Sequence, residues 1–309
     1  MYAKKRIKGK VNTFCFIGSL NSYIFACNIN KNSMKKERMV KLLMTLLCVM
    51  MMIPAAAGPK NRISRNKMGI VAHRGFWNCE EAGYARNSLA ALRCAQEAGF
   101  WGSEFDVNMT ADDTLIVFHD GKIDGKLIED YPFAEFKSYR LENGEPIPTL
   151  DQYLEQGKLY PETMLVYELK PHSSPEVEDR FVRLTIESLE KHGLLDPKRV
   201  MFISFSFHIC QRLGELLPDF SVQYLEGNMN PKEVKAVGIN GIDYHFSVFD
   251  KHLLWSKEAR KLRMTTNAWT VNKDEDIRRV IQHRVMYITT DNPLQVRELL
   301  KEAKVREVR

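Results

Sequence analysis

The chain has 309 residues, of which 44% are hydrophobic and 10% aromatic. This composition excludes a collagen-like, coiled-coil or disordered protein, and the length is sufficient for one large core or two smaller ones. The formal net charge is +6, but residues 1–57 hold ten basic residues and one acidic residue. Residues 58–309 therefore carry 35 basic and 38 acidic side chains, and we expect no nucleic-acid partner for this part of the chain.

The N-terminal segment predicts a secretory signal peptide that begins at Met34. Four basic residues precede an apolar run over 42–53, and the run ends in Pro54 followed by three alanines. Exported proteins carry a charged segment, a short apolar segment and a cleavage site in this order. The run is shorter than the roughly 20 residues that span a membrane. We therefore expect an exported protein, periplasmic or extracellular, with no stable membrane span after cleavage; an uncleaved anchor is the alternative.

Residues 1–33 precede this signal peptide and match no part of it, so we expect translation to start at Met34. The folded part then forms one domain, 58–309. Three cysteines remain in this domain, namely Cys79, Cys94 and Cys210. Their odd number and irregular spacing indicate neither a disulfide framework nor a CxxC metal site. We expect buried thiols, with a single bridge as the alternative.

The domain alternates between short apolar runs and amphipathic segments. The apolar runs predict buried parallel strands over 69–73, 102–107, 163–169, 199–204, 220–225, 241–244, 264–270 and 285–289. Apolar residues at three- and four-residue spacing predict helices over 88–98, 150–156, 177–192, 207–217, 232–237, 251–261, 275–283 and 292–303. Eight strand–helix alternations in about 250 residues are typical of an α/β protein with a (β/α)8 TIM barrel. A doubly wound open sheet is the alternative, weakened because no G-x-G-x-x-G turn follows a strand.

One segment, 121–148, interrupts this alternation after the second strand. It is rich in glycine, proline and charged residues. In a barrel, long strand-to-helix loops lie on the face that carries function. We therefore expect a small insertion beside the functional site.

Polar residues follow the first two predicted strands. His73 and Arg74 end the first strand, and Glu104 and Asp106 lie two positions apart on the second, so both carboxylates face the same side. His119 follows a short apolar extension of the second strand. Because the carboxyl ends of barrel strands meet at one mouth, we expect these side chains to gather there.

The third strand adds Glu168 and Lys170, again two positions apart. Three carboxylates are a hard-oxygen site that suits Mg²⁺ or Ca²⁺. Two histidines can form a proton-transfer pair, and Arg74 and Lys170 can hold an anion. This combination suits the hydrolysis of a phosphate ester.

Six motifs in this order resemble the glycerophosphodiester phosphodiesterase family over about 69–300. They are His73-Arg74, Glu104-Phe105-Asp106, His119-Asp120, Glu168-Leu169-Lys170, the run AWTVN at 268–272 and the run ITTDNP at 288–293. The resemblance implies a TIM barrel with a small insertion after the second strand, which would be 121–148 here. Within this family, the chain resembles bacterial members that are exported.

The resemblance also implies a role for each residue. The carboxylates of Glu104, Asp106 and Glu168 would hold a divalent metal, Ca²⁺ or Mg²⁺. The two histidines would be the acid–base pair, with His73 as the base and His119 as the acid by analogy with relatives.

The remaining implied roles concern the substrate. The side chains of Arg74 and Lys170 would contact the substrate phosphate, and Trp269 would line the pocket. Two aromatic residues that directly follow the first motif, Phe76 and Trp77, are further candidates for a wall around the alcohol group.

One motif departs from the family pattern. Where family members often have PENT, this chain has Ala85-Arg86-Asn87-Ser88, so Arg86 replaces an acidic residue of the site. We favour a subfamily variation in which Ser88 still caps the following helix. In the alternative, Arg86 meets an additional anionic group of an unusual substrate.

The sequence therefore predicts a metal-dependent hydrolase that cleaves glycerophosphodiesters, the deacylated remains of phospholipids, to glycerol 3-phosphate and an alcohol. A phospholipase or another phosphodiesterase on the same fold is one alternative, although no amphipathic membrane helix is evident in the domain. A second alternative is an inactive barrel that binds a phosphorylated ligand. A third is a glycosidase that uses Glu104 and Glu168 as a carboxylate pair, which would leave both histidines without a role.

Overall fold

The computed structural model describes residues 66–309. The predicted signal peptide and the predicted start at Met34 lie outside the described residues, and both stay predictions.

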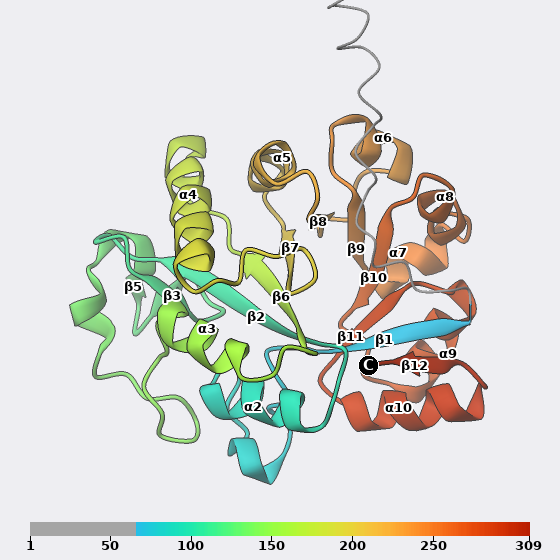
Figure 1. Cartoon of the computed structure of the whole chain (residues 1–309), viewed down its shortest axis with the longest axis horizontal. Helices are drawn as coiled ribbons and strands as arrows, with labels where there is room; N and C mark the ends of the chain where they lie inside the picture. The colour runs from blue at the N-terminus through green and yellow to red at the C-terminus, as the bar shows by residue number, and fades with distance from the viewer. Residues whose placement is uncertain (1–65) are drawn as a thin grey trace, which may run out of the picture. The chain divides into compact units, whose positions relative to one another are not determined.

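Eight parallel strands form a closed barrel (Figure 1). They are β1 (Lys67–Ala72), β2 (Gly102–Met109), β6 (Met164–Leu169), β7 (Val200–Ser204), β8 (Ser221–Tyr224), β9 (Gly241–His245), β10 (Thr265–Trp269) and β11 (Tyr287–Thr290). Neighbours in the chain are neighbours in the barrel, and β1 closes the ring by pairing with both β2 and β11. The predicted TIM barrel is confirmed, and the open doubly wound sheet is excluded.

Two further strands extend this sheet. β3 (Leu115–Val117) runs antiparallel to the end of β2, and β12 (Arg306–Val308) runs parallel to the start of β1. The C-terminus therefore lies beside the first strand of the barrel (Figure 1).

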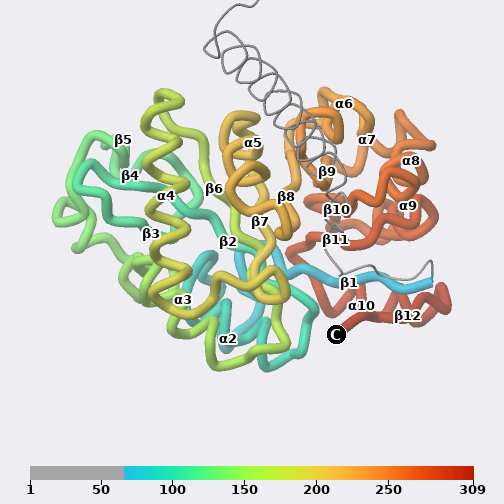
Figure 2. Tube along the Cα trace, turned by 45° about the horizontal axis from the view of Figure 1, so that its top comes forward, coloured from blue at the N-terminus to red at the C-terminus, as the bar shows by residue number. Residues whose placement is uncertain are grey.

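Helices surround the strands on the outside (Figure 2). They are α2 (Leu89–Glu97), α3 (Leu150–Lys158), α4 (Pro175–Lys191), α5 (Phe207–Leu216), α6 (Pro231–Ala236), α7 (Phe246–Lys251), α8 (Trp255–Lys261), α9 (Asp274–His283) and α10 (Pro293–Glu302). A short 3₁₀ helix, η1 (Glu80–Ala82), precedes α2. Side chains between strands and helices form the main core, in which Phe105, Tyr167 and Phe202 are fully buried.

Hydroxyl side chains determine where several helices begin. Ser88 accepts a hydrogen bond from the backbone of Ala91 at the start of α2, as expected from the sequence. Thr149 and Gln152 form a reciprocal capping box at the start of α3. Such caps satisfy backbone N–H groups that have no partner within the helix, and each stabilises a helix by about 1 kcal/mol.

The predicted helix over 251–261 starts too early, because α8 begins at Trp255 and Lys251 is the last residue of α7. α7 ends at Lys251, and the backbone of His252 leaves the helical region with φ −124° and ψ 66° before α8 begins. The periodicity that predicted one helix included Leu253 and Leu254, which are 67% and 61% exposed. Apolar spacing without burial therefore gave a false helical signal.

The insertion lies after β3 and contains a two-stranded hairpin, β4 (Lys122–Ile123) and β5 (Lys126–Leu127). Two 3₁₀ helices follow, η2 (Ile128–Asp130) and η3 (Phe133–Phe136), and the segment has a small hydrophobic cluster of its own.

His172 links the insertion to the barrel. Its Nδ1 lies 2.8 Å from Glu129 Oε2, and its Nε2 accepts a hydrogen bond from the backbone of Met109. This is a structural role for a histidine that follows the third barrel strand.

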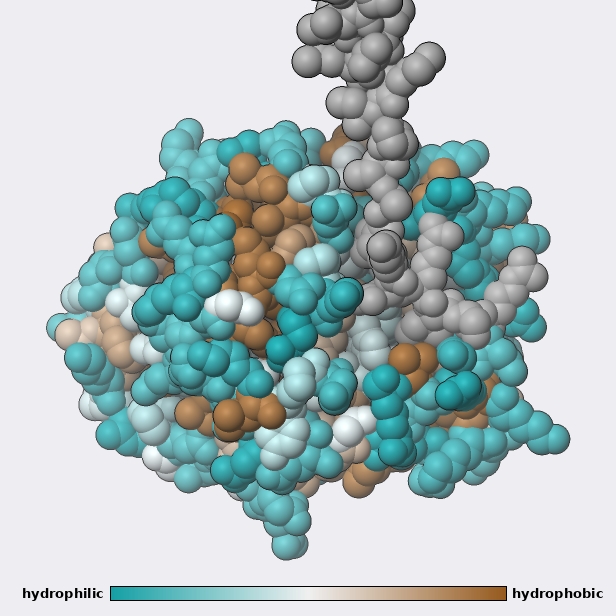
Figure 3. All heavy atoms as spheres, viewed as in Figure 1, coloured by the Kyte–Doolittle hydropathy of each residue, from teal (hydrophilic) through white to brown (hydrophobic). Residues whose placement is uncertain are grey.

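The three cysteines of the described domain are free thiols, and Cys94 and Cys210 are buried, as expected. On the face shown in Figure 3, hydrophobic side chains gather between α4 and α5. Within 66–309, the helices are too short or too polar to cross a bilayer.

Candidate active site

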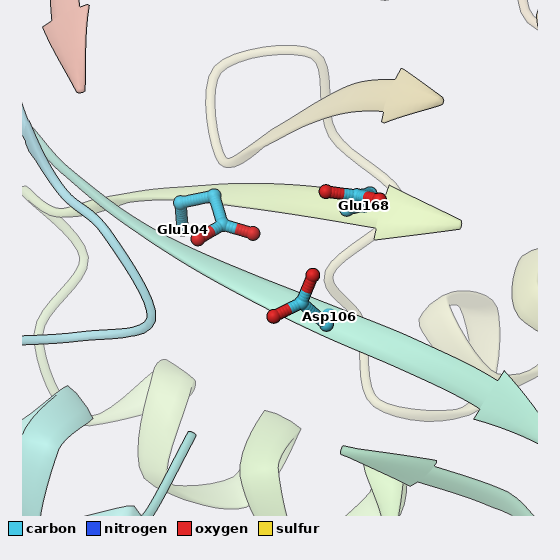
Figure 4. Close-up of side chains that lie close together, drawn as sticks. All are labelled: Glu104, Asp106 and Glu168. Atoms are coloured by element: carbon cyan, nitrogen blue, oxygen red, sulfur yellow. The ribbon is translucent and has the colours of Figure 1, made fainter. Parts of the chain in front are cut away.

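Three buried carboxylates lie together on two neighbouring strands (Figure 4). Glu104 and Asp106 come from β2 and Glu168 from β6, where Asp106 and Glu168 are register partners. One oxygen atom from each lies within 4.8 Å of the other two. The two-residue spacing on β2 therefore places both of its carboxylates on the same side, as the sequence predicts.

These carboxylates strongly influence one another. Burial, together with repulsion from Asp106 and Glu168, raises the pKa of Glu104 well above its ordinary value. Burial and the charge of Asp106 raise the pKa of Glu168 to about 7. Burial disfavours the charged form of Asp106 as well, but Lys170, His119 and Arg74 outweigh it and lower its pKa to about 2. Arg74 and Lys170 therefore do not fully compensate the negative charge of three ionised carboxylates.

A divalent cation suits this cluster. Glu104 Oε1 is buried and has no hydrogen-bond partner among the described residues. An oxygen-only set of three carboxylates is the ligand type that Ca²⁺ and Mg²⁺ prefer. A cation bound there would supply the positive charge that compensates the ionised carboxylates.

Two basic side chains border the cluster. Arg74 Nε lies 3.4 Å from Asp106 Oδ2, and Lys170 Nζ lies 3.2 Å from Asp106 Oδ1 and 2.7 Å from Glu168 Oε1. Both are the residues that the sequence predicts for the substrate phosphate. Fixed positive charge beside the carboxylates can stabilise a phosphate group.

The turn after β1 holds Arg74 against the cluster. Its backbone N–H donates to Glu104 Oε2 at 2.8 Å, and its φ is +55°, in the left-handed region. Gly75 follows with φ +80°, and a Cβ atom there would lie 2.7 Å from the backbone carbon of Ala91. Only glycine permits this close approach to α2.

His73 is oriented by a carboxylate. Its Nδ1 lies 2.8 Å from Asp291 Oδ1, which also accepts a hydrogen bond from Trp77 Nε1 at 3.0 Å. Asn272 Nδ2 donates to the other oxygen, Oδ2, at 2.6 Å. Burial opposes ionisation of Asp291, but the bonds from His73, Trp77 and Asn272 outweigh it and lower its pKa to about 2. An ionised carboxylate on Nδ1 keeps the proton there and leaves Nε2 as the acceptor of a neutral imidazole.

His119 lies at the rim and is more exposed. Its Nδ1 is 2.7 Å from Asp120 Oδ1, and 40% of its side chain is accessible. Burial lowers the pKa of His119, and Lys170 and Arg74 act in the same direction, against the opposing charge of Asp106.

A pocket of about 130 Å³ joins these groups. Its polar side is formed by His73, Arg74, Glu104, His119 and Glu168. Its other wall includes Phe205, Leu225, Asp243 and Trp269. Trp269, a predicted pocket residue, is fixed by a hydrogen bond from its Nε1 to the backbone oxygen of Asp243 at 2.9 Å.

Residues 73–295 match the model of the Glycerophosphoryl diester phosphodiesterase family. The chain belongs to this family. It is therefore a glycerophosphodiester phosphodiesterase-family enzyme, a phosphoric diester hydrolase, and not the glycosidase considered above.

Individual relatives agree with the family assignment. The chain is 27% identical over 304 residues to a glycerophosphodiester phosphodiesterase of Bacillus subtilis, a match that covers 84% of this chain and 97% of that protein. A crystal structure of a glycerophosphodiester phosphodiesterase from Parabacteroides distasonis is 39% identical, with a TM-score of 0.74, and covers 77% of this chain and 98% of the other. A phosphodiesterase from Oleispira antarctica, solved with the product sn-glycerol-3-phosphate, shares the fold at 23% identity and a TM-score of 0.64, over 75% and 96% of the two chains.

Four predicted site residues of this phosphodiesterase do not line the pocket: Asp106 and Lys170, which belong to the charged cluster beside it, and Phe76 and Arg86. Arg86 stacks over the ring of Trp77, 3.7 Å from its centroid, and lies 3.9 Å from Glu142 Oε1. Phe76 packs edge-on against Phe100, with 5.5 Å between ring centroids. The pocket roles of Arg86 and Phe76 stay predictions.

Three further residues reach the site although the sequence analysis gave them no role. Asp291 orients His73, as described above. Asn87 is buried, donates to Asp106 Oδ2 at 2.9 Å and accepts from the Asp106 backbone at 3.2 Å. Asp243 is an acidic residue within a buried strand. Charged residues are rarely buried, and this is the one feature of the sequence that could have pointed to it.

Proposed function

We propose that this phosphodiesterase hydrolyses glycerophosphodiesters to glycerol 3-phosphate and an alcohol, with His73 as base and His119 as acid. The observation that supports it is the meeting of both histidines with the carboxylate cluster in one pocket. The product held by the Oleispira antarctica phosphodiesterase is the one proposed for this chain.

His73 is the proposed base because Asp291 occupies its Nδ1. Nε2 can then take a proton from the attacking oxygen, and the carboxylate stabilises the imidazolium that forms. The contact therefore supports the orientation of His73 that this step requires.

His119 is the proposed acid. Its partial exposure leaves it free to take up a proton from solvent and give it to the alkoxide that leaves the phosphorus. Burial lowers the pKa of His119, which makes the protonated ring a readier proton donor, and Asp120 on its Nδ1 opposes this shift.

Glu104, Asp106 and Glu168 are the proposed ligands of the cation, Ca²⁺ or Mg²⁺. When bound, the cation would polarise the phosphoryl oxygens and offset negative charge that develops there. Arg74 and Lys170 add fixed positive charge on the same side of the pocket and help to orient the phosphate.

The experiment that tests this function measures glycerol 3-phosphate release from glycerophosphocholine and glycerophosphoethanolamine. His73→Ala and His119→Ala should each lower kcat by at least about 100-fold. His208→Ala is the matched control, because this partly exposed histidine of α5 pairs with Asp179 outside the pocket. Full activity in His73→Ala, or an equal loss in His208→Ala, contradicts the assignment.

We also propose that the enzyme is exported and acts outside the cytoplasm on the deacylated remains of phospholipids. The support is the predicted signal peptide that begins at Met34. Mass spectrometry of the N-terminus in fractionated cells tests this; a mature chain that begins near residue 58 is expected, and an uncleaved chain in the cytoplasm contradicts it.

A further inference from the structure

Asp243 is a buried acid in the barrel that the proposed chemistry does not use. It lies on β9, is 1% exposed and lines the pocket. Its Oδ2 accepts a hydrogen bond from Asn267 Nδ2 at 3.0 Å, whereas its Oδ1 has no hydrogen-bond partner among the described residues. Buried polar atoms are nearly always paired, so an unpaired oxygen on a residue that lines a pocket calls for an explanation.

The neighbours of Asp243 are already engaged. Asn267 donates to Thr289 Oγ1 at 2.8 Å as well, and its own oxygen accepts from the backbone of Ala268. Trp269 donates to the backbone oxygen of Asp243 rather than to the carboxyl group. These contacts satisfy only one of the two carboxyl oxygens of Asp243.

The position of Asp243 relates it to the substrate and not to the cation. In the ring of barrel strands, β9 is four strands away from β2 in either direction, so Asp243 faces Glu104 across the pocket. Asp243 is not a member of the carboxylate group whose oxygens lie within 4.8 Å of one another. A substrate whose phosphate lies beside Arg74 would extend one of its two organic groups toward Asp243.

Apolar side chains make up much of the wall around Asp243. Ile203, Phe205 and Leu225 line it from β7 and from the turns that follow β7 and β8, and Thr270 and Thr289 also line the pocket. A few polar groups within a mostly apolar wall are the arrangement that fixes the orientation of a ligand.

We propose that Asp243 is a specificity-determining residue whose Oδ1 hydrogen-bonds a hydroxyl of the substrate's glycerol group. The assignment rests on the proposed function, because it concerns the same pocket and the same substrate. Glycerol is the part common to all glycerophosphodiesters, and its hydroxyls distinguish it from a simple alkyl group.

A hydroxyl is the partner that Asp243 fits best. A hydroxyl donates to a carboxylate and accepts from a carboxylic acid, so it pairs with either form of the side chain. Burial and the charge of Glu168 raise the pKa of Asp243 well above its ordinary value, which favours the neutral form and disfavours a cationic partner. The quaternary ammonium of choline has no proton to donate, so it cannot satisfy Oδ1.

The test compares glycerophosphocholine with propylphosphocholine, in which a propyl group replaces glycerol. Choline release gives kcat/KM for both on one scale. The wild type should prefer glycerophosphocholine by at least 100-fold, because a buried polar group is left unpaired by the analogue. Asp243→Leu, which removes both carboxyl oxygens, should lower kcat/KM for glycerophosphocholine by about 10- to 100-fold, mainly through KM, and change propylphosphocholine by less than about 3-fold.

Gln223→Leu is the matched control, because Gln223 also has a buried, unpaired oxygen in the barrel but does not line the pocket. It should leave the preference for glycerol intact. An equal loss on both substrates in Asp243→Leu, or no loss on either, overturns the assignment.

The wild type alone provides a second measurement that needs no folded variant. Each of the two monohydroxy analogues of propylphosphocholine restores one hydroxyl, and one of them should recover most of the preference. Equal rates on glycerophosphocholine and propylphosphocholine overturn the role of Asp243 while leaving the proposed function standing. No hydrolysis of either substrate with Ca²⁺ or Mg²⁺ overturns the proposed function itself.

Discussion

The Nδ1 atom of His73 lies 2.8 Å from Oδ1 of Asp291, although 218 positions separate the two residues in the chain. They meet because β1 and β11 pair at the seam of the barrel, with Ala72 opposite Thr290. Each residue directly follows the end of its strand. Closure of the barrel therefore assembles the base and the group that orients it.

Asp291→Asn should lower kcat by about 100-fold or more. An amide cannot carry the charge that stabilises the His73 imidazolium, and it permits the wrong tautomer of the ring. The pH dependence of kcat/KM measures this effect, because the acidic limb of the profile reports the base that Asp291 positions. Trp77→Phe removes only one hydrogen bond to Asp291 and should therefore lower kcat less than Asp291→Asn does. An unchanged kcat and profile in Asp291→Asn contradicts the role.

Asn87 should control the affinity of the carboxylate cluster for its cation. Its side chain makes two hydrogen bonds with Asp106, and its φ is +57°. Asn87→Gly keeps the backbone conformation and removes only the amide, so it isolates the side chain. We expect a 10- to 100-fold weaker affinity for Ca²⁺ or Mg²⁺ by titration calorimetry. Ser88→Ala, which removes the neighbouring helix cap, should cost stability without this loss of affinity.

The cation-free enzyme should become less stable as the pH rises through the neutral range. Glu168 has its pKa raised from 4.5 to about 7, so between these values the folded state holds a proton that the unfolded state has released. The free energy of unfolding therefore falls as the pH rises across this window, by about 3 kcal/mol for Glu168 alone. Glu104, whose pKa is raised as well, acts with the same sign.

Thermal unfolding in EDTA between pH 4.5 and 7.5 measures this dependence. Ca²⁺ or Mg²⁺ should raise the Tm more at pH 7.5 than at pH 5, because the cation replaces the protons. Glu168→Gln should flatten the dependence. A Tm in EDTA that rises steadily across the window is incompatible with the raised pKa of Glu168.

Arg86 should have little effect on turnover. Its guanidinium stacks on Trp77 rather than lining the pocket, and 44% of its side chain is exposed. Arg86→Ala is expected to change kcat/KM by less than about 3-fold, and equally for glycerophosphocholine and glycerophosphoserine. A loss confined to glycerophosphoserine, whose head group carries an additional carboxylate, would support the alternative in which Arg86 binds an extra anion.

Patterns within single elements predicted most of the fold. Each predicted barrel strand overlaps an observed strand, because buried parallel strands are short apolar runs. The two-residue spacing of Glu104 and Asp106 was sufficient to predict a shared face. Leu253 and Leu254 are exceptions, because the periodicity of apolar residues does not reveal which of them are buried.

The contacts that complete the site depend on tertiary structure. Asn87 reaches Asp106 only through its left-handed backbone, and Asp291 reaches His73 only through barrel closure. The unpaired oxygen of Asp243 is defined by what its neighbours bind, which a linear sequence does not state. The roles of these three residues therefore emerged from the structure, although Asp291 and Asn87 lie in segments that the sequence analysis names.

The most direct test of the account is glycerol 3-phosphate formation from glycerophosphocholine by the wild-type chain, followed by phosphorus NMR with Ca²⁺, with Mg²⁺ and with EDTA. We predict that EDTA stops the reaction, that Ca²⁺ or Mg²⁺ restores it, and that Glu104→Gln responds to neither cation. Glycerol 3-phosphate formed at an undiminished rate in EDTA, or no product with either cation, would contradict a metal-dependent glycerophosphodiester hydrolase built on Glu104, Asp106 and Glu168.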